Sequence, residues 1–290
     1  MPPLFGKGFD RVMTEGPEAT FLADMMYRHF RGKRLLRVRI LAGRYKTHGP
    51  GRGFLAFQRL LPLRLTDVYK KGKVIFLFFE GGWCLIAKMG MTGWFYRGVE
   101  TEEGKGKGRP LHRSSPNVAF DFEGGEELLF ADFRNFGTLT FTNDVLTIVE
   151  EMDRLAPDVL NPYTTYEDIR SRVEEVKPAL SVEQALMDQT LLMSGIGNIL
   201  KSEVLYEARV SPRRKVKDVV EAEWRRIVSA AKKVSKKTLA VLEGREGENR
   251  EEYTGIRQVY DREADPDGNR VLSYRASDGR TTFYVPSIQT

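Results

Sequence analysis

Residues 193–198, with the sequence MSGIGN, decide how the second half of the chain is organised. They join two predicted helices through Gly195 and Gly197, and glycine adopts the backbone conformations that a tight connection requires. Such a turn exposes backbone N–H groups at the start of the second helix, where a phosphate binds readily. A tight turn capped by Asn198 explains the same residues without any ligand. The stretch therefore predicts a helix–turn–helix unit and leaves its ligand open.

The sequence on either side of this turn changes its hydrophobic period several times. Residues 181–242 have a helical pattern, and an earlier amphipathic helix begins at Pro17 and ends at Gly32. Between them, residues 34–141 alternate short β-like runs with Gly-rich turns, which favours an antiparallel β-sandwich. The arms of a hairpin are expected at 271–274 and 281–285. The predicted fold is therefore α+β and multidomain: a leading helix, a sandwich, a helical domain and a C-terminal hairpin.

Composition limits the class of protein. The chain has 290 residues, of which 41% are hydrophobic and 30% are charged, as expected for a globular protein with two domains. The longest apolar run, Val74 to Phe79, is far shorter than the roughly 20 residues of a membrane span. The single cysteine, Cys84, and three scattered histidines offer no cluster with metal-ligand spacing. We therefore expect no membrane partner, no metal and no other cofactor.

The net charge of +6 permits a polyanionic partner. Basic side chains far outnumber acidic ones between residues 209 and 237. A run of this kind is also typical of a solvated helix face, so it does not identify the partner by itself.

Acidic side chains stand at the start of the first helix. Glu15 and Glu18 flank Pro17, where carboxylates stabilise a helix by interacting with its dipole. Lys73 lies immediately before an apolar strand, a common position for a surface lysine. Neither observation alone separates a catalytic role from a structural one.

Two further motifs carry groups suited to nucleic acid. Residues 132–137 place Arg134 and Phe136 two positions apart, a pair that can enter a base stack but that an edge strand also accommodates. Arg280 precedes two threonines in the predicted hairpin, where it can bind phosphate or remain exposed to solvent.

In their order along the chain, these motifs resemble those of the formamidopyrimidine-DNA glycosylase/endonuclease VIII family, from about Thr14 to Gln289. The matching stretches are TEGPE (14–18), KGK (71–73), MGMTG (89–93), DFRNFG (132–137), LMDQ (186–189), GIGN (195–198) and GRTTFY (279–284). The resemblance implies a helix–two-turn–helix domain behind the sandwich, and damaged double-stranded DNA held between the two. The implied boundaries are an N-terminal extension at 1–13, a catalytic sandwich at 14–142, a linker at 143–165, the helix–two-turn–helix domain at 166–252 and a finger at 253–290.

The finger departs from the usual family pattern of four cysteines around zinc. Residues 264–269 (ADPDGN) and 285–289 (VPSIQ) occupy the places where those cysteines would lie. This is similar to the zincless finger of the endonuclease VIII-like branch. Residues 42–45 (AGRY) and 134–136 (RNF) also resemble the giant-virus members of that branch. The resemblance therefore implies a preference for oxidised pyrimidines and formamidopyrimidines.

The second departure concerns the nucleophile. The family uses the amine of an N-terminal proline followed by glutamate, whereas here Thr14 precedes Glu15 and a further thirteen residues precede Thr14. We expect the functional chain to start at Met13, so that removal of this methionine exposes the Thr14 amine. An α-amine with a pKa near 7.7–8.0 is roughly 10–15% unprotonated at pH 7, against about 0.04% for a lysine. Lys73 is therefore the fallback nucleophile.

The resemblance also implies a role for each matching residue. The Thr14 amine attacks C1′ of the flipped nucleotide, Glu15 supplies a proton, and a Schiff base leads to β,δ-elimination. The residues expected to fill the vacated space are Met91, Arg134 and Phe136, and those expected to hold phosphates are Lys73, Gly197, Asn198 and Arg280. Glu18 is expected to orient the helix and the amine.

The resulting expectation is a monomeric, bifunctional DNA glycosylase and AP lyase of base excision repair, working inside the cell with DNA. The alternative is a catalytically inactive protein that binds damaged DNA, which applies if the N-terminal extension is retained. A basic nucleic-acid-binding module unrelated to repair predicts no preference for damaged duplex, and it does not explain the positions of the motif residues.

Overall fold

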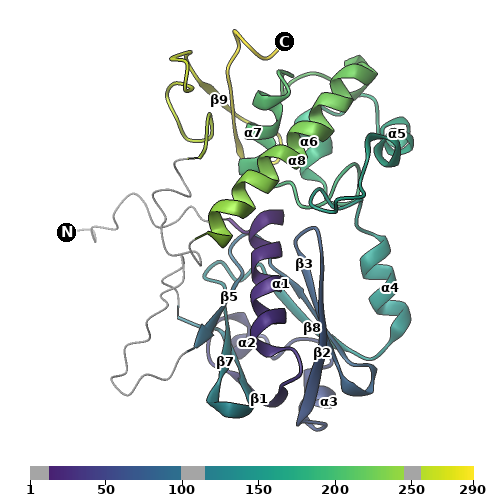
Figure 1. Ribbon diagram of the computed structural model, residues 1–290, viewed down its shortest axis with the longest axis vertical. Helices are drawn as coiled ribbons and strands as arrows, with labels where there is room; N and C mark the ends of the chain where they lie inside the picture. Colours follow the sequence, from purple (N-terminus) through teal and green to yellow (C-terminus); the bar gives the residue numbers. More distant parts are fainter. Residues whose placement is uncertain (1–12, 99–114, 245–255) are drawn as a thin grey trace, which may run out of the picture. The chain divides into compact units, whose positions relative to one another are not determined.

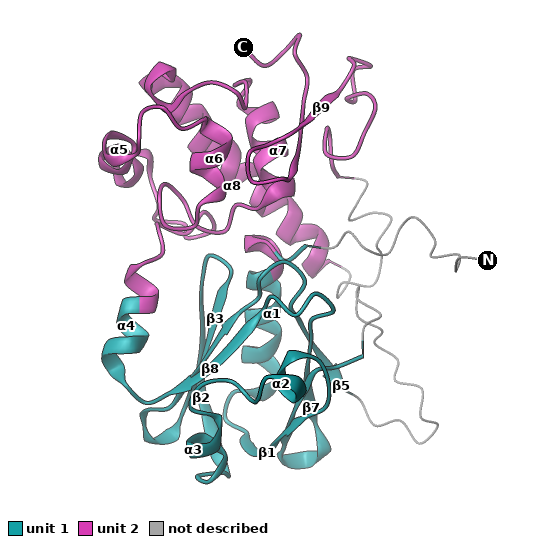
Figure 2. Ribbon diagram, turned by 180° about the vertical axis from the view of Figure 1, so that it is seen from behind, with its two compact units in different colours: residues 1–14, 19–150 teal, residues 15–18, 151–290 magenta. Residues whose placement is uncertain are grey.

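The computed structural model describes residues 13–98, 115–244 and 256–290 (Figure 1). The chain divides into two compact units, residues 1–14 with 19–150 and residues 15–18 with 151–290 (Figure 2). The predicted extension before residue 13 lies outside the described residues, as do almost all of the polar loop expected at 98–116 and residues 245–255.

The first unit is an antiparallel β domain with a leading helix, as predicted. Its helices are α1 (Gly16–Phe30), whose first residues belong to the second unit, α2 (Arg44–Thr47), α3 (Phe54–Gln58), and the start of α4 (Val145–Asp153). Its strands are β1 (Arg34–Ile40), β2 (Leu63–Lys71), β3 (Val74–Phe79), β4 (Cys84–Lys88), β5 (Trp94–Gly98), β6 (Val118–Phe122), β7 (Glu127–Ala131) and β8 (Thr138–Thr142). Single 3₁₀ turns, η1 (Glu80–Gly82) and η2 (Glu123–Gly125), connect strand pairs at the predicted Gly-rich turns.

The strands follow the order β5-β7-β6-β1-β2-β3-β4-β8, and every neighbouring pair is antiparallel. Strands β1 and β2 pair only at Arg34 with Arg64 and at Leu35 with Leu63. The sheet therefore consists of two four-stranded halves that share one short seam, and a single strand order runs through both. Strands β3 and β4 are buried almost throughout, and apart from Lys88 at the end of β4 their residues are apolar and do not alternate.

Helix α3 closes the core of this unit through one aromatic side chain. Phe57 is fully buried, and its ring centroid lies 5.1 Å from that of Phe79, 5.0 Å from Phe141 and 5.5 Å from Trp83. Aromatic pairs at these separations stabilise a core beyond the area that they bury. The sequence analysis predicted no helix here, because α3 is only five residues long.

We expect Phe57→Ala to lower the free energy of unfolding of the protein by about 3–5 kcal/mol, since it removes a buried ring and leaves a cavity. Leu55→Ala on the same helix is the matched control, because Leu55 is 66% exposed. Urea unfolding of both variants measures the difference. Equal losses for the two variants would contradict this assignment of the core.

The second unit is mainly helical, as predicted for residues 181–242. It contains α5 (Tyr166–Glu175), α6 (Val182–Met187), α7 (Asn198–Glu207), the 3₁₀ turn η3 (Val216–Asp218), α8 (Glu221–Glu243), and the strands β9 (Leu272–Arg275) and β10 (Thr281–Tyr284). The predicted capping box is present at α6, where the Ser181 N–H donates to Gln184 Oε1 at 3.0 Å. Helix α4 lies within the stretch 143–165 that we predicted as a linker.

The cores of the second unit fix α7 and the hairpin. Trp224 and Ile227 of α8 belong to one buried cluster with Leu200 and Val204 of α7. A smaller cluster joins the hairpin segment to α7 through Tyr206, Val259, Val271 and Val285. Strands β9 and β10 pair antiparallel with Thr281 opposite Arg275, which confirms the predicted C-terminal hairpin.

Candidate active site

Two loops of the first unit, residues 89–93 and 132–137, are fastened to each other. The carboxylate of Asp132 is fully buried and accepts hydrogen bonds from the Gly137 N–H at 2.5 Å and from the Thr92 hydroxyl. A buried carboxylate is stable when such donors surround it. Asp132 therefore sets the shape of both loops, and we assign it a structural role.

Glycine and asparagine allow these loops to approach closely. A Cβ added to Gly90 would stand 2.9 Å from the carbonyl carbon of Phe136, so a larger residue would push the loops apart. Asn135 has a φ of 56°, a left-handed conformation that asparagine tolerates, and its Oδ1 accepts the Arg44 N–H at 3.0 Å. Gly90 and Asn135 of the two predicted motifs are therefore explained by the close approach of the loops.

The site residues predicted in the first unit are linked through these loops. The Thr14 N–H donates to Met91 O at 3.1 Å, and the Thr14 hydroxyl donates to Gly93 O at 2.6 Å. The Met89 N–H donates to Lys73 O at 3.4 Å, which places the β2–β3 turn beside the same loop. Thr14 itself is only 1% exposed.

Arg134 and Phe136 project from the second loop. The Arg134 guanidinium lies 3.8 Å from the Met91 sulfur, and the Arg134 N–H donates to the Thr92 hydroxyl at 3.4 Å. Phe136 is 59% exposed. The structure thus brings together Met91 and Arg134, two of the three residues expected to fill a vacated base position, and exposes the third.

The second unit fixes the carboxylate of Glu15. Glu15 Oε1 accepts the Ile199 N–H at 2.8 Å, and Oε2 accepts the Leu200 N–H at 2.9 Å. These amides belong to the first turn of α7, where the helix dipole favours a negative charge. Both oxygens of the 2% exposed side chain are therefore held in one orientation.

The glycine turn before α7 contacts the first residue of α1. The Gly16 N–H donates to Gly195 O at 2.7 Å, and a Cβ on Gly16 would stand 3.0 Å from the Gly195 Cα. Gly195 has a φ of 101°, which only glycine adopts readily. Glu18 accepts the Glu15 N–H at 2.8 Å through Oε2. Glu18 therefore fixes the backbone N–H of Glu15, and the orienting role expected for it stays a prediction.

The residues predicted to hold phosphates in the second unit lie near one another. Gly197 precedes α7 in an extended conformation, and Asn198 begins the helix. Asn198 Nδ2 donates to Thr281 O at 3.1 Å and to the Tyr260 hydroxyl at 3.2 Å, which ties α7 to the strand that follows Arg280. The Arg280 side chain is 37% exposed and lies 3.8 Å from an Asp278 oxygen.

A cavity of about 190 Å³ lies within the second unit beside the two acidic residues at the start of α1. Its lining combines Glu15 and Glu18 with side chains from α7, α8 and residues 256–258. Lys233 and Glu207 contribute an ion pair of 2.6 Å to this lining. Its mixed acidic and basic groups can donate and accept hydrogen bonds.

Sequence reasoning missed three buried charged residues of α6 and α7: Glu183, Lys201 and Glu203. The Glu203 carboxylate accepts the N–H groups of Gln258, Val259 and Tyr260 at 2.8–3.0 Å. Burial raises the pKa of this carboxyl, and the three backbone donors oppose that effect. A charged residue in a helix is ordinarily exposed, so no pattern in the sequence indicated these contacts.

Within the described ranges, no three His, Cys, Asp or Glu side chains gather as a candidate metal site, and no helix is long and apolar enough to cross a membrane. Cys84 is buried in β4, and burial raises the pKa of its thiol to about 12. It is therefore a packing residue.

Comparison with known proteins identifies the family. Residues 13–139 match the formamidopyrimidine-DNA glycosylase N-terminal domain, and residues 155–247 match the formamidopyrimidine-DNA glycosylase H2TH domain. These matches cover most of the chain, so it belongs to the formamidopyrimidine-DNA glycosylase family. It is therefore a DNA glycosylase of base excision repair, of the bifunctional class that also cleaves the strand at an abasic site, and DNA is its partner.

Named relatives agree with this assignment. The chain is 28% identical to the formamidopyrimidine-DNA glycosylase of Acidothermus cellulolyticus over 78% of this chain and 76% of the relative. It is 28% identical to that of Listeria innocua, over 79% of each. These relatives bear the formamidopyrimidine name, and the endonuclease VIII-like branch stays a prediction.

Solved structures share the fold. The Lactococcus lactis formamidopyrimidine DNA glycosylase bound non-covalently to DNA with an AP site matches with a TM-score of 0.77 at 18% identity. A MutM complex with DNA containing carbocyclic 8-oxo-G matches with a TM-score of 0.77 at 19% identity. Each match covers 95% of this chain and 99% of the other, which confirms the predicted fold.

Proposed function

We propose that this glycosylase removes oxidised bases, with pyrimidines and formamidopyrimidines favoured, through a Schiff base formed by the Thr14 amine. One observation carries the proposal. Glu15 follows Thr14 in sequence, and its carboxylate accepts hydrogen bonds from two backbone N–H groups of α7. A proton donor or acceptor in a fixed orientation beside the reacting amine is what this chemistry requires.

The match to the N-terminal domain supports a start at this point, since it begins at residue 13. Removal of Met13 leaves Thr14 with a free amine. Its nitrogen forms a bond to C1′ of the damaged nucleotide while the bond from C1′ to the base breaks, and the departing base takes up a proton. The C1′–O4′ bond then breaks as O4′ takes up a proton and the nitrogen loses one, which opens the sugar and gives the imine. Glu15 transfers these protons, and the imine permits β- and then δ-elimination of the flanking phosphates.

The cavity beside Glu15 and Glu18 suits the extruded base. A base must leave the duplex before C1′ can be reached, and its polar edge then needs new hydrogen-bond partners. The acidic and basic groups of the lining provide both acceptors and donors. This supports assigning the cavity as the receptor for the flipped base.

The remaining predicted residues would hold the DNA. Phe136, exposed beside Arg134 and Met91, is suited to insertion where the base has left. Arg280, Asn198, Gly197 and Lys73 would face phosphates. A repair enzyme with these contacts works inside the cell, where the DNA is.

Strand cleavage on a panel of duplexes tests the substrate proposal. We expect the chain that begins at Thr14 to act faster on thymine glycol and on formamidopyrimidines than on 8-oxoguanine, all placed in one sequence. The products should carry phosphate at both ends of the gap, since β,δ-elimination removes the sugar. Faster action on 8-oxoguanine would reject the pyrimidine preference, and products from β-elimination alone would reject the second elimination.

A further inference from the structure

The C-terminal hairpin needs an anchor that its own residues do not supply. Strands β9 and β10 have four residues each, and an isolated two-stranded hairpin of this size is marginally stable in water. Residues 253–290 contain no cysteine and no histidine, so the common ligands of a structural zinc ion are missing from this segment. Side chains of the preceding helices must therefore hold the hairpin.

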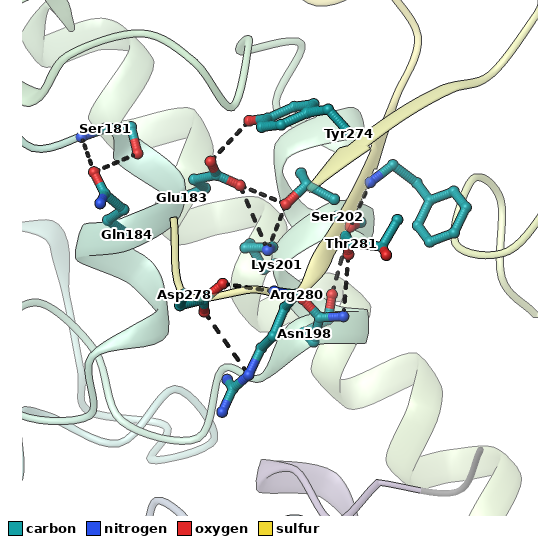
Figure 3. Close-up of polar contacts among 12 residues, drawn as sticks. Ser181, Glu183, Gln184, Asn198, Lys201, Ser202, Tyr274, Asp278, Arg280 and Thr281 are labelled. Carbon is teal, nitrogen blue, oxygen red and sulfur yellow. Dashed lines mark hydrogen bonds and ion pairs between the residues drawn. The ribbon is translucent and has the colours of Figure 1, made fainter. Parts of the chain in front are cut away.

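A buried polar network joins the hairpin to α6 and α7. Lys201 Nζ donates to the Thr282 hydroxyl at 2.7 Å and lies 3.5 Å from Glu183 Oε2. The Thr282 hydroxyl donates to Glu183 Oε2 at 2.5 Å, and the Tyr274 hydroxyl donates to Glu183 Oε1 at 2.8 Å. Figure 3 shows Glu183 between Lys201 and Tyr274. Both strands of the hairpin thus bond to one carboxylate.

Burying the charges of this network costs desolvation free energy, and breaking the network destabilises the fold. The side chain of Lys201 is 1% exposed and that of Glu183 is 7% exposed. Burial lowers the pKa of Lys201, and Glu183 opposes this by favouring the ammonium form. Removing one charge of such a pair leaves the other uncompensated, which is strongly destabilising.

Further contacts place the tip of the hairpin. Gln184 Nε2 donates to Ser277 Oγ at 2.7 Å, just before Arg280. Asn198 Nδ2 donates to Thr281 O, just after Arg280 (Figure 3). The Arg280 N–H donates to Asp278 Oδ1 at 3.0 Å. Arg280 therefore lies on a short arc that is tethered on both sides to α6 and α7.

Ring contacts restrain the hairpin as well. The Arg213 guanidinium lies over the Tyr274 ring, 4.1 Å from its centroid, and the Tyr274 and Tyr284 rings pack edge to face at 5.7 Å. Cation–π contact of this kind restrains the ring that bonds to Glu183.

We propose that Glu183, Lys201 and Thr282 form a positioning element that holds Arg280 where it meets a DNA phosphate. The inference rests on the proposed phosphate role of Arg280. The side chains of Lys201 and Glu183 are buried, so they act through the hairpin.

A double-mutant cycle on the full-length chain tests the inference. We expect Lys201→Met and Arg280→Ala each to weaken binding to a duplex with a tetrahydrofuran abasic site by about tenfold to a hundredfold, the loss of one charge-assisted hydrogen bond. The double variant should bind within about twofold of Arg280→Ala, because both changes remove one interaction. Lys201→Arg, which keeps the positive charge, should retain most of the wild-type affinity for this duplex.

Hydrogen exchange separates positioning from general damage. In Lys201→Met, exchange should accelerate in residues 272–284 and stay unchanged in α8. The control is Lys33→Met, which breaks the 2.6 Å ion pair with Glu126 in the first unit and should leave both exchange and binding as in wild type. Glu183→Gln keeps the shape of the side chain and replaces Lys201→Met, with the same expectations, if the latter does not fold.

Three results would overturn the inference: additive losses in the cycle, faster exchange throughout the helical unit, or unchanged binding in Lys201→Met. If Arg280→Ala binds as wild type does, the proposed phosphate role fails instead. Exchange in residues 272–284 then decides alone whether the network positions the hairpin.

Discussion

Glu15→Gln is expected to lower the rate of base release by about a hundredfold to ten-thousandfold, the range that a positioned general acid or base supplies. The side chain keeps its size, and its remaining oxygen can still accept the N–H of Ile199 or Leu200. Its amide group cannot deliver a proton to the departing base or the sugar. Single-turnover excision with enzyme in excess measures the effect without interference from product release.

Binding and folding should be far less affected by this change. One lost hydrogen bond between a backbone N–H and the buried carboxylate costs about 1.5–3 kcal/mol of stability, less than the 5–15 kcal/mol of an ordinary folded domain, so the variant is expected to remain folded. Glu221→Gln, an exposed glutamate of α8 paired with Arg225, is the control for the loss of one negative charge. Retention of more than a tenth of the wild-type rate by Glu15→Gln would remove Glu15 from the mechanism.

Activity should depend just as strongly on a free amine at Thr14. When a preceding residue is retained, the Thr14 nitrogen is part of an amide and has no nucleophilic lone pair. The fallback, Lys73, has about a few-hundredfold smaller unprotonated fraction at pH 7 than an α-amine. We therefore expect the chain that retains residues 1–13 to release bases at least about a hundredfold more slowly than the chain that begins at Thr14.

The threonine side chain is expected to matter much less than its nitrogen. In the chain that begins at residue 14, Thr14→Val keeps the amine and loses the hydroxyl that donates to Gly93 O at 2.6 Å. Its rate should stay within about tenfold of the wild-type rate, since one hydrogen bond is lost. Intact mass measurement must confirm the first residue of each protein. Equal rates with and without the extension would contradict the assignment of the amine.

The sequence predicted elements whose signals are local. The helix that begins near Pro17, the capping box of Ser181 and Gln184, and the C-terminal hairpin all follow from neighbouring residues. Helices α2 and α3 escaped prediction, because four or five residues contain too little of a helical period. The single strand order also escaped it, because the β1–β2 seam depends on residues distant in sequence.

Only those residues of the candidate site that belong to family motifs could be predicted from the sequence. The motifs indicated Thr14, Glu15, Met91 and Arg134, but not the bond from the Thr14 N–H to Met91 O. That bond depends on tertiary packing, which no local pattern records. The burial of Lys201 could not be predicted for a different reason. Its helix is buried on nearly every side, and this comes from the packing of neighbouring elements.

The most direct test is borohydride trapping on a duplex with one oxidised pyrimidine, followed by mapping of the adduct. Borohydride reduces the imine, so the protein stays attached to the DNA through the nitrogen that attacked C1′. We predict that the chain beginning at Thr14 is trapped and that the adduct lies on the peptide with Thr14 at its N-terminus. An adduct on Lys73 would contradict the amine mechanism, and the absence of any adduct with either chain would leave a protein that only binds damaged DNA.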